Sequence, residues 1–142
     1  MLTILVDTRE QLPYSWADCV SRTATLKTGD YSLPGHEDRV CIERKRLPEL
    51  WAITGAQRER FERELTRMLD FEYCAIVIEA EMREVLVGDP RTKVPPRAVI
   101  NSLASWSVQY NVAVWWAGTR SNGAALTRSL LRRFAKYRGV RI

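Results

Sequence analysis

The stretch Gly29–Lys45, GDYSLPGHEDRVCIERK, decides how this chain folds and holds its most informative charges. Its second half is an apolar run, Val40–Ile42, followed by Glu43, Arg44 and Lys45. We interpret this run as a buried strand, in which successive side chains point to opposite faces. Glu43 and Lys45 then share one face, about 6–7 Å apart. Arg44 points the other way, toward the core, where a guanidinium needs a carboxylate partner.

The charged side chains of this stretch suggest chemistry on phosphodiesters. Gly29 allows a bend that sets Asp30 beside Glu43 and Lys45. Carboxylates that converge repel one another unless a divalent cation lies among them or some take up a proton. A cation held there, with an ammonium beside it, is suited to activating water for attack on phosphorus. Glu-Arg-Lys is also a common surface tripeptide, so this interpretation depends on agreement elsewhere in the chain.

Other segments agree with it in order and spacing: VDTRE at 6–10, LKTGDY at 26–31, AQRERFEREL at 56–65 and AIVIE at 75–79. With these motifs the chain resembles the nuclease domain of the XPF-type structure-specific endonucleases, which belong to the PD-(D/E)XK superfamily. The signature of that family is Gly-Asp, a variable loop, Glu-Arg-Lys, three residues and then Asp. The resemblance covers nearly all of the chain. It departs at the last position of the signature, where this chain has Glu49.

The resemblance implies a catalytic set and a metal-binding set. The catalytic residues would be Asp7, Arg9, Glu10, Asp30, Glu43, Arg44, Lys45 and Arg58, and the ligands of Mg²⁺ or Mn²⁺ would be Asp7, Asp30 and Glu43. Lys45 would orient or deprotonate the attacking water, while Arg44 and Arg58 would order the carboxylates or clamp the phosphate. For some of these residues a purely structural role is an alternative. Asp7 could be a turn residue, Arg9 and Glu10 a local ion pair, and Arg58 a helix-surface arginine.

The composition fits one domain with an uneven distribution of charge. A chain of 142 residues, 46% hydrophobic, can bury one core but not two, so we expect a single nuclease domain over residues 1–142, without a helix-hairpin-helix or helicase domain. Residues 1–90 hold 12 basic and 17 acidic side chains, whereas residues 91–142 hold ten basic and no acidic ones. An acidic half joined to a basic half suggests a cation site beside a surface that grips a polyanion.

The cysteines, the single histidine and the lack of long apolar runs disfavour several classes of protein. Cys19, Cys41 and Cys74 are odd in number and unclustered, which indicates neither a disulfide framework nor a zinc site. His36 is the only histidine and lies among turn residues, so a solvated loop residue is favoured over a catalytic base. No apolar run approaches the roughly 18 residues of a membrane span, and no secretory segment is evident. We expect a soluble cytoplasmic protein, or a nuclear one if the source is eukaryotic.

Hydrophobic periodicity and turn residues predict alternating strands and helices. The expected strands are 2–6, 24–27, 39–45, 73–79 and 112–117, and the expected helices are 47–53, 56–69, 80–87, 96–110 and a last one capped by Ser121 and ending near residue 137. The strand 112–117 is expected to be buried. On the helix 56–69, Arg60 and Glu64 are expected to form an exposed ion pair, and on the last helix Leu126, Leu130 and Phe134 are expected to point inward. Residues 11–21 are expected to form a loop. Glu79, at the end of the fourth strand, lies near the site in related folds, although an acid at a strand end is usually just solvated. The order of elements predicts an α/β fold with a central mixed β-sheet flanked by helices, restriction-endonuclease-like by the resemblance.

Three interpretations of the function remain. The first is a divalent-metal-dependent DNA endonuclease acting on branched, flap or duplex DNA, in repair or recombination, with a homodimer or a partner nuclease or helicase subunit as the expected assembly. The second is a catalytically silent DNA-binding or scaffolding subunit of a nuclease complex. A metal-independent regulatory domain, whose charges form an ordinary ion network, is a further alternative. Intact Asp, Glu and Lys at the signature positions favour the enzyme.

Overall fold

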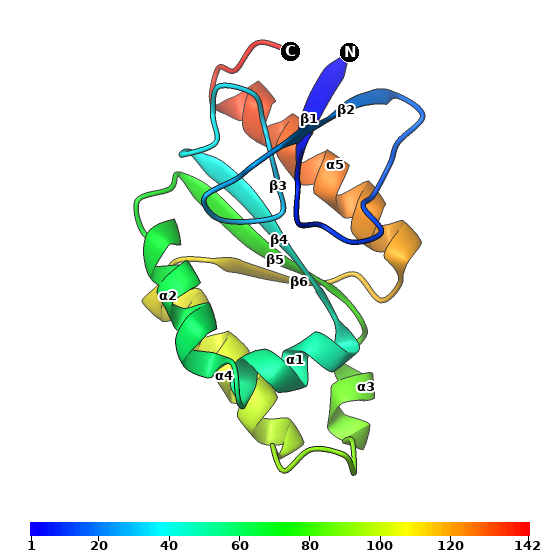
Figure 1. Cartoon of the computed structure of the whole chain (residues 1–142), viewed down its shortest axis with the longest axis vertical. Coiled ribbons are helices and arrows are strands. Elements are labelled where there is room, and N and C mark those ends of the chain that lie inside the picture. The colour runs from blue at the N-terminus through cyan, green and yellow to red at the C-terminus, as the bar shows by residue number, and fades with distance from the viewer.

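A computed structural model describes all residues of the chain, 1–142, as a mixed six-stranded sheet between two layers of helices (Figure 1). The strands are β1 (Leu2–Asp7), β2 (Cys19–Ala24), β3 (Tyr31–Ser32), β4 (Val40–Arg46), β5 (Tyr73–Glu79) and β6 (Ala113–Trp116), and the helices are α1 (Leu47–Thr54), α2 (Arg58–Met68), α3 (Met82–Val87), α4 (Pro96–Gln109) and α5 (Arg120–Tyr137). The expected α/β fold with a mixed central sheet is confirmed.

The strand order is β2-β1-β3-β4-β5-β6. Strand β1 runs parallel to β2, and β4, β5 and β6 run parallel to one another, while the short β3 joins the two groups through antiparallel pairing. Helix α5 covers one face of the sheet and α1, α2 and α4 cover the other (Figure 1). Because helices cover both faces of the sheet, the inner strand β4 carries the central motif between two cores.

The two cores divide the side chains of β4 as alternation requires. Val40 and Ile42 pack on the α5 side, in a cluster with Leu131 and Phe134 of that helix. Cys41 packs on the other side, in a cluster with residues of α1, α2 and α4 such as Phe61. The predicted alternation of this strand is therefore confirmed.

Helix α1 begins directly where β4 ends. Pro48 occupies its first turn, Glu49 accepts hydrogen bonds from the backbone amide and the guanidinium of Arg46, and Gly55 follows the last turn. Strand and helix are thus fused without a loop, which fixes the direction in which β4 delivers its last charged residues.

Some local predictions were wrong. The second strand is Cys19–Ala24 and not 24–27, because it pairs in parallel with all six residues of β1 at the sheet edge, where its side chains are mostly exposed and give no apolar signal. Strand β6 is also an edge strand, so its side chains are half-buried or exposed and not fully buried. The cap of α5 is Thr119, whose hydroxyl accepts a hydrogen bond from the amide of Asn122, and not Ser121.

The inward face of α5 also differs from the expected one. The buried residues of this helix are Gly123, Thr127, Leu131, Phe134 and Ala135. Leu126 and Leu130, expected to point inward, are half-buried at the margin of the contact. None of the helices of the structure is both long enough and apolar enough to cross a membrane.

Candidate active site

The end of β4 presents an acid and an amine on one face, as the sequence predicts. Glu43 is buried, with 4% of its surface exposed, and its Oε1 lies 3.1 Å from Nζ of Lys45. The Lys45 ammonium lies 5.2 Å from the centre of the Phe61 ring of α2. The other carboxylate oxygen of Glu43, Oε2, is buried and has no hydrogen-bond partner.

Asp30 is held beside this pair by the segment between β2 and β3. Gly29 has φ = +82°, and a Cβ there would come within 2.6 Å of Cys41 Cβ, so only glycine fits this close approach. The amide of Asp30 donates to the carbonyl of Ile42 at 2.9 Å. The amide of Arg44 in turn donates to Oδ2 of Asp30 at 2.8 Å. Backbone contacts on both sides therefore fix the carboxylate next to β4.

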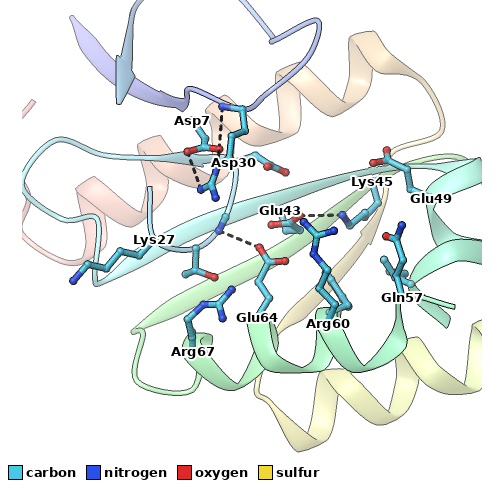
Figure 2. A pocket seen from close by; sticks show the side chains of 15 residues that line it. Asp7, Lys27, Asp30, Glu43, Lys45, Glu49, Gln57, Arg60, Glu64 and Arg67 are labelled. Atoms are coloured by element: carbon cyan, nitrogen blue, oxygen red, sulfur yellow. Dashed lines mark hydrogen bonds and ion pairs between the residues drawn. The ribbon is translucent and has the colours of Figure 1, made fainter. Parts of the chain in front are cut away.

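A cavity of about 320 Å³ opens between β4, the Lys27–Asp30 segment and one face of α2 (Figure 2). Its lining contains as many acidic as basic side chains: Asp7, Asp30, Glu43, Glu49 and Glu64 against Arg9, Lys27, Lys45, Arg60 and Arg67. A second cavity of about 340 Å³ adjoins it, shares Asp30, Glu43 and Lys45, and is also lined by Glu10 and Arg44. The polar character of both cavities suits a charged ligand.

The carboxyl groups at the centre of the cavity have strongly shifted pKa values. Burial, followed by repulsion from Glu10, raises the pKa of Asp30 to about 7, against the opposing effects of the Arg44 amide and Lys45. Burial also raises the pKa of Glu43 well above its ordinary value, and nearby Asp30 adds to the effect. Burial would lower the pKa of Lys45, but Glu43 and Asp30 outweigh it and raise that pKa. Both acids are therefore costly to ionise in this site.

Asp7 differs from these two acids, because it is already saturated with donors. Its carboxylate accepts hydrogen bonds from Nε of Arg9 and from the amide of Leu26, both at 2.9 Å. Burial would raise the pKa of Asp7, but the hydrogen bonds from Arg9 and Leu26 lower it. Asp7 lines the cavity, yet its charge is balanced by Arg9, whose side chain is 68% exposed.

The predicted metal ligands Asp7, Asp30 and Glu43 share the cavity, but they do not form a closed set. No three side chains of His, Cys, Asp or Glu in the structure are grouped closely enough to hold a metal ion by themselves. Asp30 and Glu43 nevertheless fit a hard divalent cation, since they are adjacent oxygen donors, repel each other and leave Glu43 Oε2 without a partner. The assignment of Asp7 as a third ligand stays a prediction.

Arg44 lies on the opposite face of β4 and is enclosed there. Its Nε donates to Oε2 of Glu79 at 2.6 Å, and its Nη1 donates to Glu10 Oε2 at 3.2 Å and to the carbonyl of Leu12 at 2.9 Å. The guanidinium also packs 4.4 Å from the centre of the Tyr14 ring. The predicted carboxylate partner of Arg44 is confirmed, and Glu79 is buried in this ion pair and not solvated.

Other sequence-predicted residues lie at varying distances from the cavity. Arg58 does not line it, because its Nη1 donates to the hydroxyl of Ser102 at 2.7 Å and its guanidinium packs on the Trp106 ring of α4. Glu10 accepts a hydrogen bond from the Tyr31 hydroxyl at 2.5 Å, in addition to the one from Arg44. Glu49 lines both cavities while it caps α1.

Sequence reasoning missed the contribution of α2. The cavity is lined by four polar residues at positions 57, 60, 64 and 67 (Figure 2), namely Gln57, Arg60, Glu64 and Arg67. The sequence interpretation placed Glu64 in an exposed ion pair with Arg60, whereas Oε1 of Glu64 accepts a long hydrogen bond, 3.4 Å, from the amide of Gly29. The helical spacing of these residues, opposite buried Phe61, Leu65 and Met68, is a signal that could have identified them.

The chain is similar to known proteins in its sequence pattern and in its fold. The pattern of the ERCC4 domain family matches residues 6–130. XPF from Aeropyrum pernix superposes with a TM-score of 0.76 over 99% of this chain and 64% of that chain, at 19% identity. XPF from the same organism in complex with DNA gives a TM-score of 0.72 over 96% and 66% of the two chains, at 18% identity. No curated protein matches the chain.

These structural likenesses show a fold shared with XPF, and this fold is the restriction-endonuclease-like one that the sequence predicts. This chain spans 64% of the first XPF chain, so the likeness concerns only part of that protein. The family match, in contrast, covers most of the chain and includes the segments that carry Asp7, Asp30, Glu43 and Lys45. The protein belongs to the ERCC4 domain family.

Proposed function

We propose that this protein is a DNA endonuclease that depends on Mg²⁺ or Mn²⁺ and acts on branched, flap or duplex DNA. The observation that carries the proposal is the pairing of two acids, the half-buried Asp30 and the buried Glu43, with a lysine in an open, polar cavity. Such a pair is costly for folding, so its presence is best explained by a bound cation. Membership in the ERCC4 domain family and the fold shared with an XPF that was solved in complex with DNA support the nucleic acid as the substrate.

The side chains of the cavity would divide the work as follows. Asp30 and Glu43 would hold the cation, with Asp7 as the predicted third ligand. When bound, the cation would polarise the phosphate and lower the pKa of a water molecule. Lys45 is held as an ammonium by Glu43 and Asp30, so it is suited to orienting the nucleophile and to balancing the charge that builds on the phosphate oxygens.

Arg44 would act from the opposite face of β4, by positioning Asp30 through the hydrogen bond that its backbone amide donates to the carboxylate.

Two observations favour the alternative of a catalytically silent DNA-binding or scaffolding subunit. No group of three acids is assembled to hold a metal, and the Asp7 charge is balanced by Arg9. A silent subunit would keep the fold and the basic surface without needing such a group. The enzyme is preferred because Asp30, Glu43 and Lys45 are all present and adjacent, which a silent subunit would not require.

The test is cleavage of labelled duplex, single-stranded, flap and four-way DNA in Mg²⁺, Mn²⁺ or EDTA. We expect cleavage with either metal and none in EDTA. Asp30→Asn and Lys45→Ala should each abolish cleavage while DNA binding, measured in Ca²⁺, is largely kept. Binding without cleavage under every condition would instead support the silent subunit, and cleavage retained by Asp30→Asn would refute the site.

A further inference from the structure

The wall of the cavity around Asp30 and Glu43 contains cations without acidic partners, one on the segment that carries Asp30 and two on α2. Lys27, Arg60 and Arg67 line the cavity and are exposed, and none of them has a carboxylate oxygen within 4.0 Å, although five acidic residues share the same lining. In contrast, Arg9 and Lys45 of the same cavity are each paired with an acid. The free cations are therefore available to an anion that enters from outside.

A buried hydroxyl on the same wall also lacks a partner. Thr28 is 4% exposed, it lines the cavity, and its Oγ1 makes no hydrogen bond. A buried hydroxyl without a partner costs folding free energy, so it is expected where a ligand supplies the missing contact. Only three buried side-chain polar atoms in the protein have no partner, and two of them, Thr28 Oγ1 and Glu43 Oε2, belong to this cavity.

The positions of the two arginines on α2 align this wall with the helix axis. Arg60 and Arg67 are seven residues apart, so they lie on one face of the helix about 10.5 Å apart along its axis. That distance exceeds the rise of about 3.4 Å per nucleotide along the axis of B-form DNA, so the two arginines can contact different phosphates of one strand. Glu64 lies between the two arginines and faces the same cavity (Figure 2). A strand lying along α2 would thus meet a cation on either side of the acidic centre.

We propose that Lys27, Thr28, Arg60 and Arg67 form a phosphate-binding wall that holds one nucleic-acid strand along α2, with the Thr28 hydroxyl as a hydrogen-bond donor to a phosphate oxygen. This inference rests on the proposed function and names the surface of the same site that grips the strand. It requires no catalysis, so it can be tested by binding alone.

The experiment is titration of the protein with a fluorescent oligonucleotide, followed by anisotropy in Ca²⁺ and in EDTA at several salt concentrations. Arg60→Gln and Arg67→Gln should each weaken binding about threefold to tenfold and reduce the slope of log affinity against log salt by about 0.7–0.9. Arg63→Gln is the matched control. It removes the same charge from an exposed, unpaired arginine of the same helix that does not line the cavity, and it should leave affinity nearly unchanged.

Thr28 provides a test that separates binding from folding. Thr28→Val keeps the shape and removes the hydroxyl, so it should weaken binding about threefold while the melting temperature stays the same or rises. Thr28→Ser, which keeps the hydroxyl, should bind within about twofold of the wild type. A Thr28→Val protein that binds normally, or arginine variants that do not differ from Arg63→Gln, would overturn the inference even if the enzyme cleaves DNA. Binding losses at this wall in a protein that never cleaves would leave the inference intact and refute the endonuclease.

Inorganic phosphate and a mononucleotide distinguish a strand from a single phosphate group. A strand-binding wall predicts that, at equal ionic strength, neither competes with the oligonucleotide below millimolar concentration. Competition at micromolar concentration would mean a site for a small phosphorylated ligand and would contradict the wall as described.

Discussion

The two faces of β4 place neighbouring residues in opposite electrostatic situations. On the α5 side, Arg44 donates hydrogen bonds to Glu79, Glu10 and the Leu12 carbonyl. Glu79 also accepts a hydrogen bond from the Tyr14 hydroxyl, and Glu10 accepts one from the Tyr31 hydroxyl. On the α2 side, Glu43 and Lys45 face an open cavity, and an oxygen of Glu43 has no partner. The α5 side of β4 is therefore an electrostatically complete face, whereas the α2 side is an incomplete face, which needs a ligand to balance its charges.

Motif residues that are adjacent in sequence therefore need not share a function. Buried charges are tolerated when hydrogen bonds and opposite charges replace the lost water, as around Arg44. Where a buried oxygen lacks such a partner, as Oε2 of Glu43 does although Oε1 is paired with Lys45, the cost persists and indicates a role outside folding. Arg44 is therefore interpreted as a positioning residue, which holds its own amide against Asp30, while Glu43 and Lys45 are interpreted as the reactive pair.

The largest effect is expected from breaking the complete face. Arg44→Ala would leave the carboxylates of Glu79 and Glu10 buried without their cation, which should lower the free energy of unfolding by about 3–5 kcal/mol. Urea titration measures the change. Arg46→Ala, two residues along the same strand and mostly exposed, is the control and should cost less than about 1 kcal/mol. Equal losses for the two variants would show that the network around Arg44 does not stabilise the fold.

The opposite result is expected from the incomplete face. Glu43→Gln removes a buried carboxyl group whose ionisation is unfavourable, and Lys45, its ion-pair partner, still has Asp30 nearby. The free energy of unfolding should therefore stay the same or rise by about 1–2 kcal/mol. Cleavage should nevertheless fall at least about a thousandfold, because a cation ligand is lost. Unfolding curves and single-turnover cleavage of the same preparation test both parts. A destabilised Glu43→Gln protein would indicate that Glu43, like Arg44, serves the fold.

The sequence predicted this division only in part, for physical reasons. Alternation along an apolar strand is enough to separate Glu43 and Lys45 from Arg44, and burial of a guanidinium is enough to require an acidic partner. The identity of that partner, Glu79, depends on the parallel pairing of β4 with β5, which no local pattern encodes. The same holds for Glu10, which reaches Arg44 from the loop after β1.

The α2 side was predicted less well than β4. Polar residues on a helix are usually solvated, so Arg60, Glu64 and Arg67 give no signal until the helix is placed over the cavity. Arg58 illustrates the converse, since it matches a family position but its guanidinium bonds to Ser102 of α4. The edge strand β2 was misplaced for a similar reason, because its stability comes from pairing with β1 and not from apolar burial.

The smallest expected effect is a change of the free energy of unfolding with pH, which should come from one face of β4 and not from the other. Burial raises the pKa of Asp30 to about 7, so the folded state binds a proton more tightly than the unfolded state between pH 4 and 7. The stabilisation is fully present below the unfolded pKa and is lost as the pH rises through 7, by an amount on the order of 1 kcal/mol after solvent screening. Urea unfolding between pH 5 and 8 should show this decline in the wild type.

One variant and one added ion show whether the loss of stability with rising pH comes from the incomplete face. Asp30→Asn should flatten the profile, since the titrating group is gone. Millimolar Mg²⁺ should also flatten it, because a cation stabilises the ionised carboxylates that the empty cavity disfavours, and the stabilisation by Mg²⁺ should therefore be larger at pH 8 than at pH 5. The complete face predicts no such dependence, because Arg44 keeps its charge throughout this range. A profile unchanged by both Asp30→Asn and Mg²⁺ would remove Asp30 from the cation site and leave Glu43 as its only supported ligand.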